Sequence, residues 1–372
     1  MASSNLVSSP VLLALAASYL LFLQPHPNNA NSLITCHFDK IYQFGDSISD
    51  TGNLIRQKPI GAATAFAKLP YGETFFKHAT GRCSNGRLMI DFIAQASGLP
   101  FLNPYLEKDA DFRHGVNFAV AGATALTTKV LAKKSIIDRL TNSSLKVQRD
   151  WMSKHCIIER DCMEKQKTSL FVLKIGGNDY SFAFQEGKSI QDVKKLVPEV
   201  VAAIISGVRR VIISYGAVRV VVPGNFPMVC FPIYLTLFKT NNSNAYDKHR
   251  CLIDINNLAV YHNEKLQEAI QELKTEYPEV VIVYGDYYHA FLWLFDHAVQ
   301  LGFNGDTTQK ACCGIGGDYN FNPTNMCSST VPVCPNPNRF ISWDGIHLTE
   351  AGYKRIAEWL IDDMLPKLQC YN

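Results

Sequence analysis

The sequence lacks the features of a membrane-spanning or nucleic-acid-binding protein. After Leu23 it contains no apolar run that approaches the roughly 20 residues needed to cross a bilayer. The formal net charge is only +3, and the basic residues are scattered as short pairs instead of forming one stripe. We therefore expect neither stable membrane insertion nor binding to nucleic acid. With 47% hydrophobic residues among 372, the chain is suited to a globular protein with one large core or two smaller ones.

Metal-ligand spacing is missing as well. Four of the eleven cysteines crowd a segment rich in Gly and Pro, without the paired Cys-x-x-Cys or Cys/His spacing of a zinc site: Cys312, Cys313, Cys327 and Cys334. This favours disulfides over zinc, and no metal or organic cofactor is implied. Cys156 and Cys162 are spaced to close a small loop, and the odd count leaves at least one thiol unpaired.

The N-terminal run from Val11 to Leu23 is apolar apart from Ser18 and too short to span a bilayer. It predicts a signal peptide of about residues 1–30, followed by a single domain over residues 31–372, since neither a linker nor an internal repeat is found. We expect a monomer in the secretory pathway, extracellular or vacuolar. Acceptor sequons at Asn142 and Asn241 lie in polar segments and predict exposed N-glycosylation sites.

Short apolar runs alternate with helical patterns along the chain. The runs are a first one that ends at Gly45, then 115–122, 169–178, 218–223 and 280–284. The helical patterns cover 82–98, 136–152, 190–214, 256–276, 287–301 and 349–368. This alternation predicts an α/β fold, a three-layer α/β/α sandwich around a central five-stranded parallel sheet with right-handed crossovers.

The first apolar run ends in Gly45-Asp46-Ser47, followed by a polar segment. A tight turn at the carboxyl end of a central strand would lift the Ser47 hydroxyl toward the crevice where open α/β sheets bind ligands. Such a serine is a candidate nucleophile if the chain also supplies a base and donors for an oxyanion. The alternative is that Ser47 and Asp46 cap a following helix.

The far end of the chain supplies the base. In Asp344-Gly-Ile-His347 the carboxylate can bond Nδ1 of the histidine within one loop and leave Nε2 for the Ser47 proton. The alternative is that Asp344 and His347 are ordinary loop residues. The order Ser, Asp, His is that of α/β-hydrolases, but the Gly-x-Ser-x-Gly pentapeptide of that fold does not occur.

Four short blocks stand in the order and spacing of the GDSL (SGNH-hydrolase) family. They are Gly45-Asp46-Ser47, Asn117-Phe-Ala with Gly122, Gly176-Gly-Asn178-Asp179, and Asp344-Gly-Ile-His347. The chain resembles a plant GDSL esterase/lipase from about Lys40 to Leu368, and this resemblance implies the flavodoxin-like SGNH-hydrolase fold. It also implies that Ser47 is the nucleophile, His347 the base and Asp344 its orienter. The Ser47 amide, the Gly122 amide and the Asn178 side chain would form the oxyanion hole.

Some residues depart from the family pattern. Ile48 replaces the leucine of the family name, Lys174 stands where an acidic or small residue is more usual, and Val229 precedes Cys230 where many relatives have glycine. These departures concern the shape of the pocket and not the chemistry.

The resemblance is with plant members that act on small specialised metabolites. We therefore expect a secreted serine carboxylesterase that hydrolyses an acetyl, other small acyl or methyl ester of a small-molecule substrate such as an alkaloid. Three alternatives stay open: an acyltransferase that uses the same acyl-enzyme, a cell-wall polysaccharide acetylesterase, and a catalytically inactive secreted binding protein.

Overall fold

The computed structural model describes residues 29–138, 140–159 and 168–370. Apart from its last two residues, the predicted signal peptide lies outside this part of the chain. The described part begins with the 3-10 helix η1 (Asn29–Cys36). Within it, no helix combines the length and apolar character needed to cross a membrane.

The predicted five-stranded parallel sheet is confirmed. Its strands are β1 (Lys40–Gly45), β2 (Gly115–Asn117), β3 (Ser169–Lys174), β4 (Arg219–Pro223) and β5 (Val281–Gly285), in the order β2-β1-β3-β4-β5. All neighbouring pairs are parallel. β1 lies between β2 and β3, so the residues that follow β1 emerge at the carboxyl edge of the sheet with a strand on either side.

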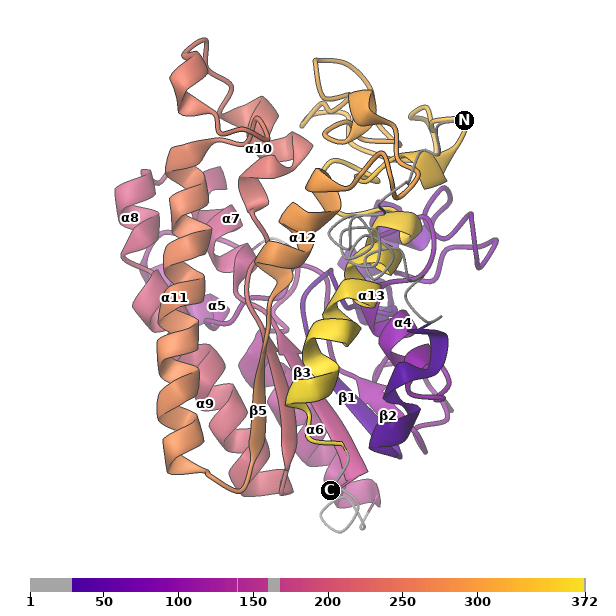
Figure 1. Ribbon diagram of the computed structural model, residues 1–372, viewed down its shortest axis with the longest axis vertical. Coiled ribbons are helices and arrows are strands. Elements are labelled where there is room, and N and C mark those ends of the chain that lie inside the picture. The colour runs from indigo at the N-terminus through magenta and orange to yellow at the C-terminus, as the bar shows by residue number, and fades with distance from the viewer. Residues whose placement is uncertain (1–28, 139, 160–167, 371–372) are drawn as a thin grey trace, which may run out of the picture.

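Helices cover both faces of the sheet, which makes the predicted three-layer α/β/α sandwich. α4 (Met89–Ala96), α12 (Tyr287–Asp296) and α13 (Glu350–Met364) lie on one side, and α6 (Leu145–Glu159), α9 (Val197–Tyr215) and α11 (Ile253–Glu276) on the other (Figure 1). The remaining α-helices are α2 (Asn53–Arg56), α3 (Ile60–Ala63), α5 (Thr128–Lys133), α7 (Gly177–Gln185), α8 (Ile190–Lys194) and α10 (Pro232–Leu237).

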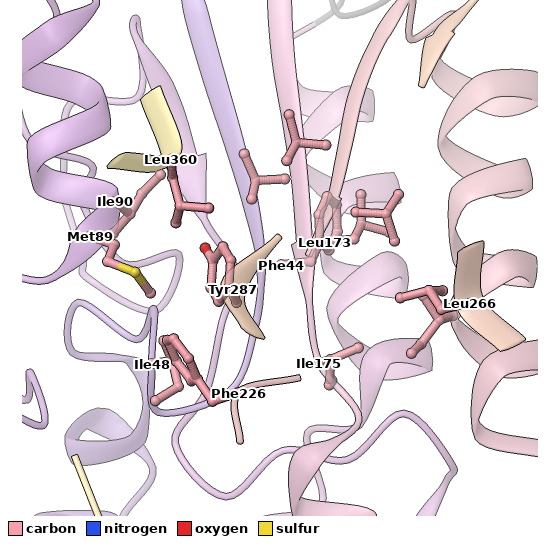
Figure 2. Close-up of a cluster of buried hydrophobic side chains, with 14 of the residues drawn as sticks. Phe44, Ile48, Met89, Ile90, Leu173, Ile175, Phe226, Leu266, Tyr287 and Leu360 are labelled. Atoms are coloured by element: carbon pink, nitrogen blue, oxygen red, sulfur yellow. The ribbon is translucent and has the colours of Figure 1, made fainter. Parts of the chain in front are cut away.

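The strands are apolar on both faces because both faces are covered. Every residue of β1 and of β3 is buried. Figure 2 shows Met89 and Leu360 on one side of the strands and Leu266 of α11 on the other, with Phe44 and Leu173 between them. The two packed faces fix the sheet, and the loops at its carboxyl edge are then free to carry side chains of the site.

Several predicted helices need correction. The helix predicted over 82–98 begins at Met89 instead, because Arg82 forms a buried ion pair with Asp91, whose carboxylate also accepts the Leu88 amide at 2.8 Å and so caps the helix start. The helix predicted over 190–214 is two helices, α8 and α9. Pro198 lies in the first turn of α9, where its missing N–H is tolerated.

The helix predicted over 136–152 is displaced toward the C-terminus. It is α6, which runs from Leu145 to Glu159. The polar segment 141–144 is irregular, with the Ser143 amide bonded to Oγ1 of Thr141, and the Ser144 carbonyl accepts the Gln148 amide as the first helical bond. α12 also ends earlier than predicted, at Asp296.

Disulfides join the cysteines of the Gly- and Pro-rich segment, as predicted: Cys312 pairs with Cys334 and Cys313 with Cys327. Further disulfides are Cys36–Cys370 and Cys230–Cys251. Cys156 is disulfide-bonded, but its predicted partner Cys162 lies outside the described residues. Among the described cysteines, the buried Cys83 is the free thiol.

Candidate active site

The turn that carries Ser47 begins at Gly45, the last residue of β1, which lies opposite Lys174 of β3. A Cβ on Gly45 would lie 2.4 Å from the carbonyl oxygen of Lys174, so any larger residue would force the strands apart. The side-chain amide of Gln148 on α6 fixes the same point, since it accepts the Gly45 N–H at 2.8 Å and donates to the Gly45 carbonyl at 2.8 Å. The end of β1 is therefore held from two directions.

Asp46 folds the turn itself. Its carbonyl accepts the amides of Ser49 and Asp50, and its Oδ1 accepts the Ile48 amide at 3.1 Å. No helix begins at this turn, since the next helix, α2, starts at Asn53, so neither Asp46 nor Ser47 is a helix cap. The Ser47 hydroxyl is engaged elsewhere: its Oγ lies 2.8 Å from Nε2 of His347.

His347 and Asp344 form the predicted pair within one loop. Nδ1 of His347 lies 2.7 Å from Oδ2 of Asp344, and Oδ1 of Asp344 accepts the backbone amides of Ile346 at 2.9 Å and His347 at 2.7 Å. The loop needs Gly345, which has a φ of 90° and whose Cβ, if present, would lie 2.2 Å from the Phe321 ring. Burial raises the pKa of Asp344, but the charge of His347 and the hydrogen bonds from this loop outweigh it and lower the pKa below its ordinary value.

Tyr71 is a partner of this pair that the sequence did not reveal. Its buried hydroxyl donates to Oδ2 of Asp344 at 2.8 Å, the same oxygen that faces His347. Phe66 packs edge-on against both the Tyr71 ring and the His347 imidazole, with ring centroids 5.0 and 5.9 Å apart. Tyr71 and Phe66 lie in a loop region rich in Gly, Ala and Pro, and no spacing in the sequence marks them.

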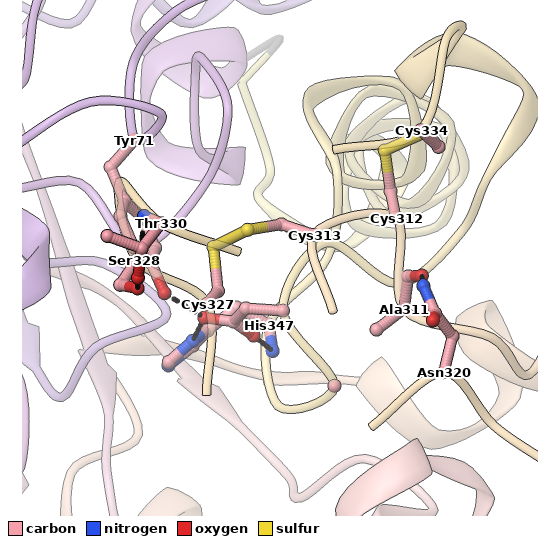
Figure 3. The surroundings of a disulfide bond; sticks show 12 residues. Tyr71, Ala311, Cys312, Cys313, Asn320, Cys327, Ser328, Thr330, Cys334 and His347 are labelled. Carbon is pink, nitrogen blue, oxygen red and sulfur yellow. Dashed lines mark hydrogen bonds and ion pairs between the residues drawn. A yellow bond between two sulfur atoms is a disulfide. The ribbon is translucent and has the colours of Figure 1, made fainter. Parts of the chain in front are cut away.

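The disulfide-tied segment around residues 310–337 supports the same loop. Cys312 and Cys313 donate their amides to the carbonyls of Ser342 and Trp343, at 3.0 and 2.7 Å. Figure 3 shows the Cys313–Cys327 disulfide beside Tyr71 and His347, and Tyr71 packs with these cysteines and Trp343 in one small apolar cluster. This segment thus packs behind the loop that carries Asp344 and His347.

The predicted oxyanion donors lie at the same edge of the sheet. In the described part of the chain, the backbone amides of Ser47 and Gly122 have no hydrogen-bond acceptor. Asn178 begins α7 after β3 and uses one hydrogen of its side-chain amide on the Ala123 carbonyl, at 2.9 Å, which leaves the second hydrogen. Ser47 and Asn178 line a common cavity, whereas Gly122 is not among its lining residues.

Two buried carboxylates, to which the sequence gave no role, tie the blocks together. Asp50 accepts the amides of Gly52, Asn53, Leu54 and Ala121 at 2.6 to 3.0 Å, and so fixes the Ser47 segment to the chain after β2. Asp179 accepts the amides of Ala125 and Leu126, both at 2.9 Å. Burial raises the pKa of both carboxyls, that of Asp179 to about 7. No helical pattern in the sequence follows Asp50, so no capping signal marked this residue.

The cavity beside Ser47 is largely apolar with a few polar groups. Its apolar lining comes mainly from the residues after β4 and from α10: Phe226, Met228, Phe231, Ile233 and Tyr234, together with Ile48 and Ile346. The polar lining is Asp46, Ser47, Lys174, Asn178, Ser181, Asn225 and His347. A concave apolar site with convergent polar groups is the usual form of a small-molecule binding site.

A serine hydroxyl, an imidazole and a carboxylate joined in this order, at the carboxyl edge of a parallel sheet, define a serine hydrolase. The comparisons with known proteins agree. The model of the GDSL-like Lipase/Acylhydrolase family matches residues 41–360.

Curated relatives match almost the whole chain. Acetylajmalan esterase 1 of Rauvolfia serpentina is 46% identical over 341 residues, which cover 90% of this chain and 89% of that protein. Acetylajmalan esterase of the same plant is 45% identical over 365 residues, with 96% and 92% covered. A GDSL esterase/lipase of Arabidopsis thaliana is 44% identical, with 87% and 86% covered. The chain belongs to the GDSL lipase/acylhydrolase family and is a serine carboxylic ester hydrolase.

Proposed function

We propose that this protein is a secreted esterase that hydrolyses an acetyl, other small acyl or methyl ester of a plant specialised metabolite, with an alkaloid ester as the first candidate. The observation that carries the proposal is the hydrogen-bonded chain from Ser47 Oγ through His347 to Asp344, at 2.8 and 2.7 Å. The two Rauvolfia relatives, named for the acetyl ester that they act on, favour this class of substrate.

Acylation begins at Ser47. His347 Nε2 takes the hydroxyl proton while Oγ bonds to the ester carbonyl carbon, and the tetrahedral oxyanion forms. The free amides of Ser47 and Gly122 and the second amide hydrogen of Asn178 are our candidates for its donors. The C–O bond to the alcohol then breaks, and His347 returns the proton to the departing oxygen.

Deacylation repeats these steps with water. His347 takes a proton from water, the hydroxide oxygen bonds to the acyl carbon, and the bond to Ser47 Oγ breaks as His347 gives the proton back to the serine. Asp344 stays ionised throughout, because its pKa lies below the ordinary value, and its charge stabilises the imidazolium that forms twice in each cycle.

The proposed setting is the secretory pathway, outside the cell or in the vacuole, with the protein as a monomer. The four disulfides between described cysteines support an oxidising compartment. Asn142 and Asn241 are both exposed, as N-glycosylation at these sequons requires.

A labelling experiment tests the nucleophile and its base. The full secreted chain is treated with a fluorophosphonate and mapped by peptide mass, in the wild type and in the variants Ser47→Ala and His347→Ala. We expect one adduct, at Ser47, that is lost in both variants while the fold, checked by circular dichroism, is kept. A folded wild type that takes no label would contradict the proposal and favour an inactive binding protein.

Turnover assays then address the reaction and the substrate. Acetyl and methyl esters of alkaloids are compared with acetylated xylan and with a triglyceride, each in the presence and absence of a competing alcohol. We expect free acid from the small esters as the main product. Transfer of the acyl group to the alcohol in place of hydrolysis would instead identify an acyltransferase, and preference for xylan a cell-wall esterase.

A further inference from the structure

A small hollow with polar walls lies beside Gly177, the residue before the oxyanion candidate Asn178. The hollow is the part of the cavity that borders Gly177, which has no side chain to fill it. A Cβ added to Gly177 would lie 3.6 Å from Oδ1 of Asn225, 3.7 Å from Sδ of Met228 and 3.8 Å from Nζ of Lys174, so these three groups surround the same point. Gly177, Asn225, Met228 and Lys174 all line the cavity that contains Ser47 and His347. The hollow is therefore a side compartment of the active site.

Lys174 brings a buried ammonium group to this compartment. The residue is only 4% exposed and stands at the end of β3, and its Nζ lies 3.1 Å from Oδ2 of Asp46, the residue before the nucleophile. An ammonium group has three N–H donors, and within the described chain Asp46 is the acceptor for one of them. Donors remain for an acceptor that the protein itself does not supply.

Asn225 brings a rigid amide group to the opposite wall. The residue is 1% exposed, and its backbone is locked by Asn263, which accepts the Asn225 N–H at 2.7 Å and donates to its carbonyl at 3.0 Å. The side-chain nitrogen Nδ2 is buried, has no hydrogen-bond partner among the described residues and is not accessible from the cavity. The amide oxygen Oδ1 is the atom that borders the hollow, and it can accept a hydrogen bond from a hydroxyl group bound there.

We propose that the Gly177 hollow is a polar subsite that binds an oxygen-bearing, uncharged group of the ester substrate, such as a hydroxyl, ether or carbonyl close to the scissile bond. Lys174 donates to this oxygen and the Asn225 amide lies beside it. The inference rests on the proposed esterase function and specifies its substrate. A carboxylate is disfavoured because Asp46 already neutralises Lys174 and would repel a second anion. The oxygen can belong to the acyl half or to the alcohol half of the ester.

Matched esters that differ by one oxygen test the proposal. On the acyl side the pair is p-nitrophenyl butanoate and p-nitrophenyl methoxyacetate, and on the alcohol side it is butyl acetate and 2-methoxyethyl acetate. In each pair one CH₂ is replaced by oxygen at nearly constant size. For each pair, the methoxy preference is kcat/KM for the methoxy ester divided by kcat/KM for its hydrocarbon partner. This preference is compared between the wild type and each variant, so that the difference in intrinsic reactivity between the two esters cancels.

Three variants alter the hollow in different ways. Gly177→Ala fills it with a methyl group at ordinary contact distances of 3.6 to 3.8 Å, without a steric clash. Asn225→Ala removes the amide, and because that side chain makes no hydrogen bond in the described chain, no partner is orphaned. Lys174→Met removes the ammonium group and is combined with Asp46→Asn, because a lone buried Asp46 carboxylate would destabilise the fold.

We expect the methoxy preference to fall about 10-fold in Gly177→Ala and in the Lys174→Met, Asp46→Asn double variant, in one of the two pairs, since a hydrogen bond from a charged donor contributes at least this factor. The pair that responds identifies the half of the ester that occupies the hollow. Unchanged ratios in both pairs, with butanoate still hydrolysed, would overturn the proposal and leave Lys174 as the counter-ion of Asp46.

Two further outcomes would also contradict the proposal. An equal Lys174-dependent gain for the p-nitrophenyl half-ester of succinic acid would refute the restriction to uncharged groups. If the wild type hydrolyses none of these esters and takes no fluorophosphonate label, the proposed esterase function itself is overturned, and the subsite with it.

Discussion

Replacing Tyr71 by phenylalanine removes one hydrogen bond to Asp344, the proposed orienter of the base, and almost nothing else. The Tyr71 ring is buried against Phe66, Trp343 and the Cys313–Cys327 disulfide, and a phenyl ring keeps all of that packing. What is lost is the 2.8 Å bond from the hydroxyl to Oδ2 of Asp344.

The size of the effect follows from the other bonds of Asp344. Oδ1 accepts two backbone amides of its own loop, whereas Oδ2 is shared by the Tyr71 hydroxyl and Nδ1 of His347. A hydrogen bond to a charged group contributes about 1.5–3 kcal/mol, so the free energy of unfolding should fall by about that amount. Without Tyr71 only His347 positions Oδ2, and we expect kcat to fall about 10-fold. KM should change little, because Tyr71 does not line the substrate cavity.

The variant should also lose less stability in acid than the wild type. The pKa of Asp344 is lowered in the folded protein, so its contribution to stability is present above its ordinary pKa and is lost as the pH falls through the lowered value. Loss of the Tyr71 bond moves the folded-state pKa up toward the ordinary one, so the pH range over which stability falls becomes narrower and the total loss smaller. Urea unfolding between pH 2 and pH 7 measures this difference.

The matched control is Tyr287→Phe. Tyr287 is also buried, but its hydroxyl forms no hydrogen bond within the described chain. We expect kcat and the acid limb of stability to stay at the wild-type level in this variant. If Tyr71→Phe also shows wild-type kcat and wild-type acid stability, Tyr71 does not position Asp344, and the reasoning is refuted.

Three more predictions follow from buried and exposed groups elsewhere. His262 is fully buried, and desolvation, together with the nearby Lys174 charge, lowers its pKa to about 3. Between this value and pH 6.5 the unfolded chain binds a proton at His262 that the folded protein does not bind. The free energy of unfolding should therefore decline below pH 6.5 by about 1.4 kcal/mol per pH unit. In His262→Gln, urea unfolding should show a weaker decline. Changing both Cys313 and Cys327 to alanine opens a loop with a sequence separation of 14 residues and should reduce the free energy of unfolding by about 3 kcal/mol. The value of kcat should also fall, because the segment that supports the His347 loop is no longer cross-linked. A variant with the melting temperature of the wild type would contradict this prediction. After expression in a plant secretory pathway, Asn142→Gln and Asn241→Gln should each remove one glycan from the intact mass, and an unchanged mass would show that the sequon is not used.

The sequence predicts those parts of the site that depend on short-range spacing. Asp344 and His347 are three residues apart, so their 2.7 Å contact needs only one turn of one loop. Ser47 was placed by its position at the end of an apolar run. The alternation of runs and helical patterns predicts a parallel sheet, but not its strand order, in which β1 lies between β2 and β3.

The partners contributed by distant segments could not be predicted in this way. Tyr71 lies 273 residues from Asp344 along the chain, and Lys174 lies 128 residues from Asp46. The sequence shows Lys174 as a departure from the family pattern, but it does not show its partner. The buried pairing of Lys174 with Asp46 depends on the register of β1 against β3, in which Gly45 lies opposite Lys174. Helix boundaries were misplaced where a side chain overrides local periodicity, as Asp91 does at the start of α4.

The two halves of the site are positioned by different means, and this explains why they tolerate different kinds of change. Ser47 and Asn178 follow β1 and β3, whose buried pairing fixes them relative to each other. His347 lies on a loop without a strand of its own, and its position depends on the amides of Cys312 and Cys313, on the two disulfides behind them and on the bond from Tyr71. Substitutions in the sheet should therefore act mainly on stability, whereas substitutions around residues 310–337 should separate base from nucleophile in a protein that stays folded.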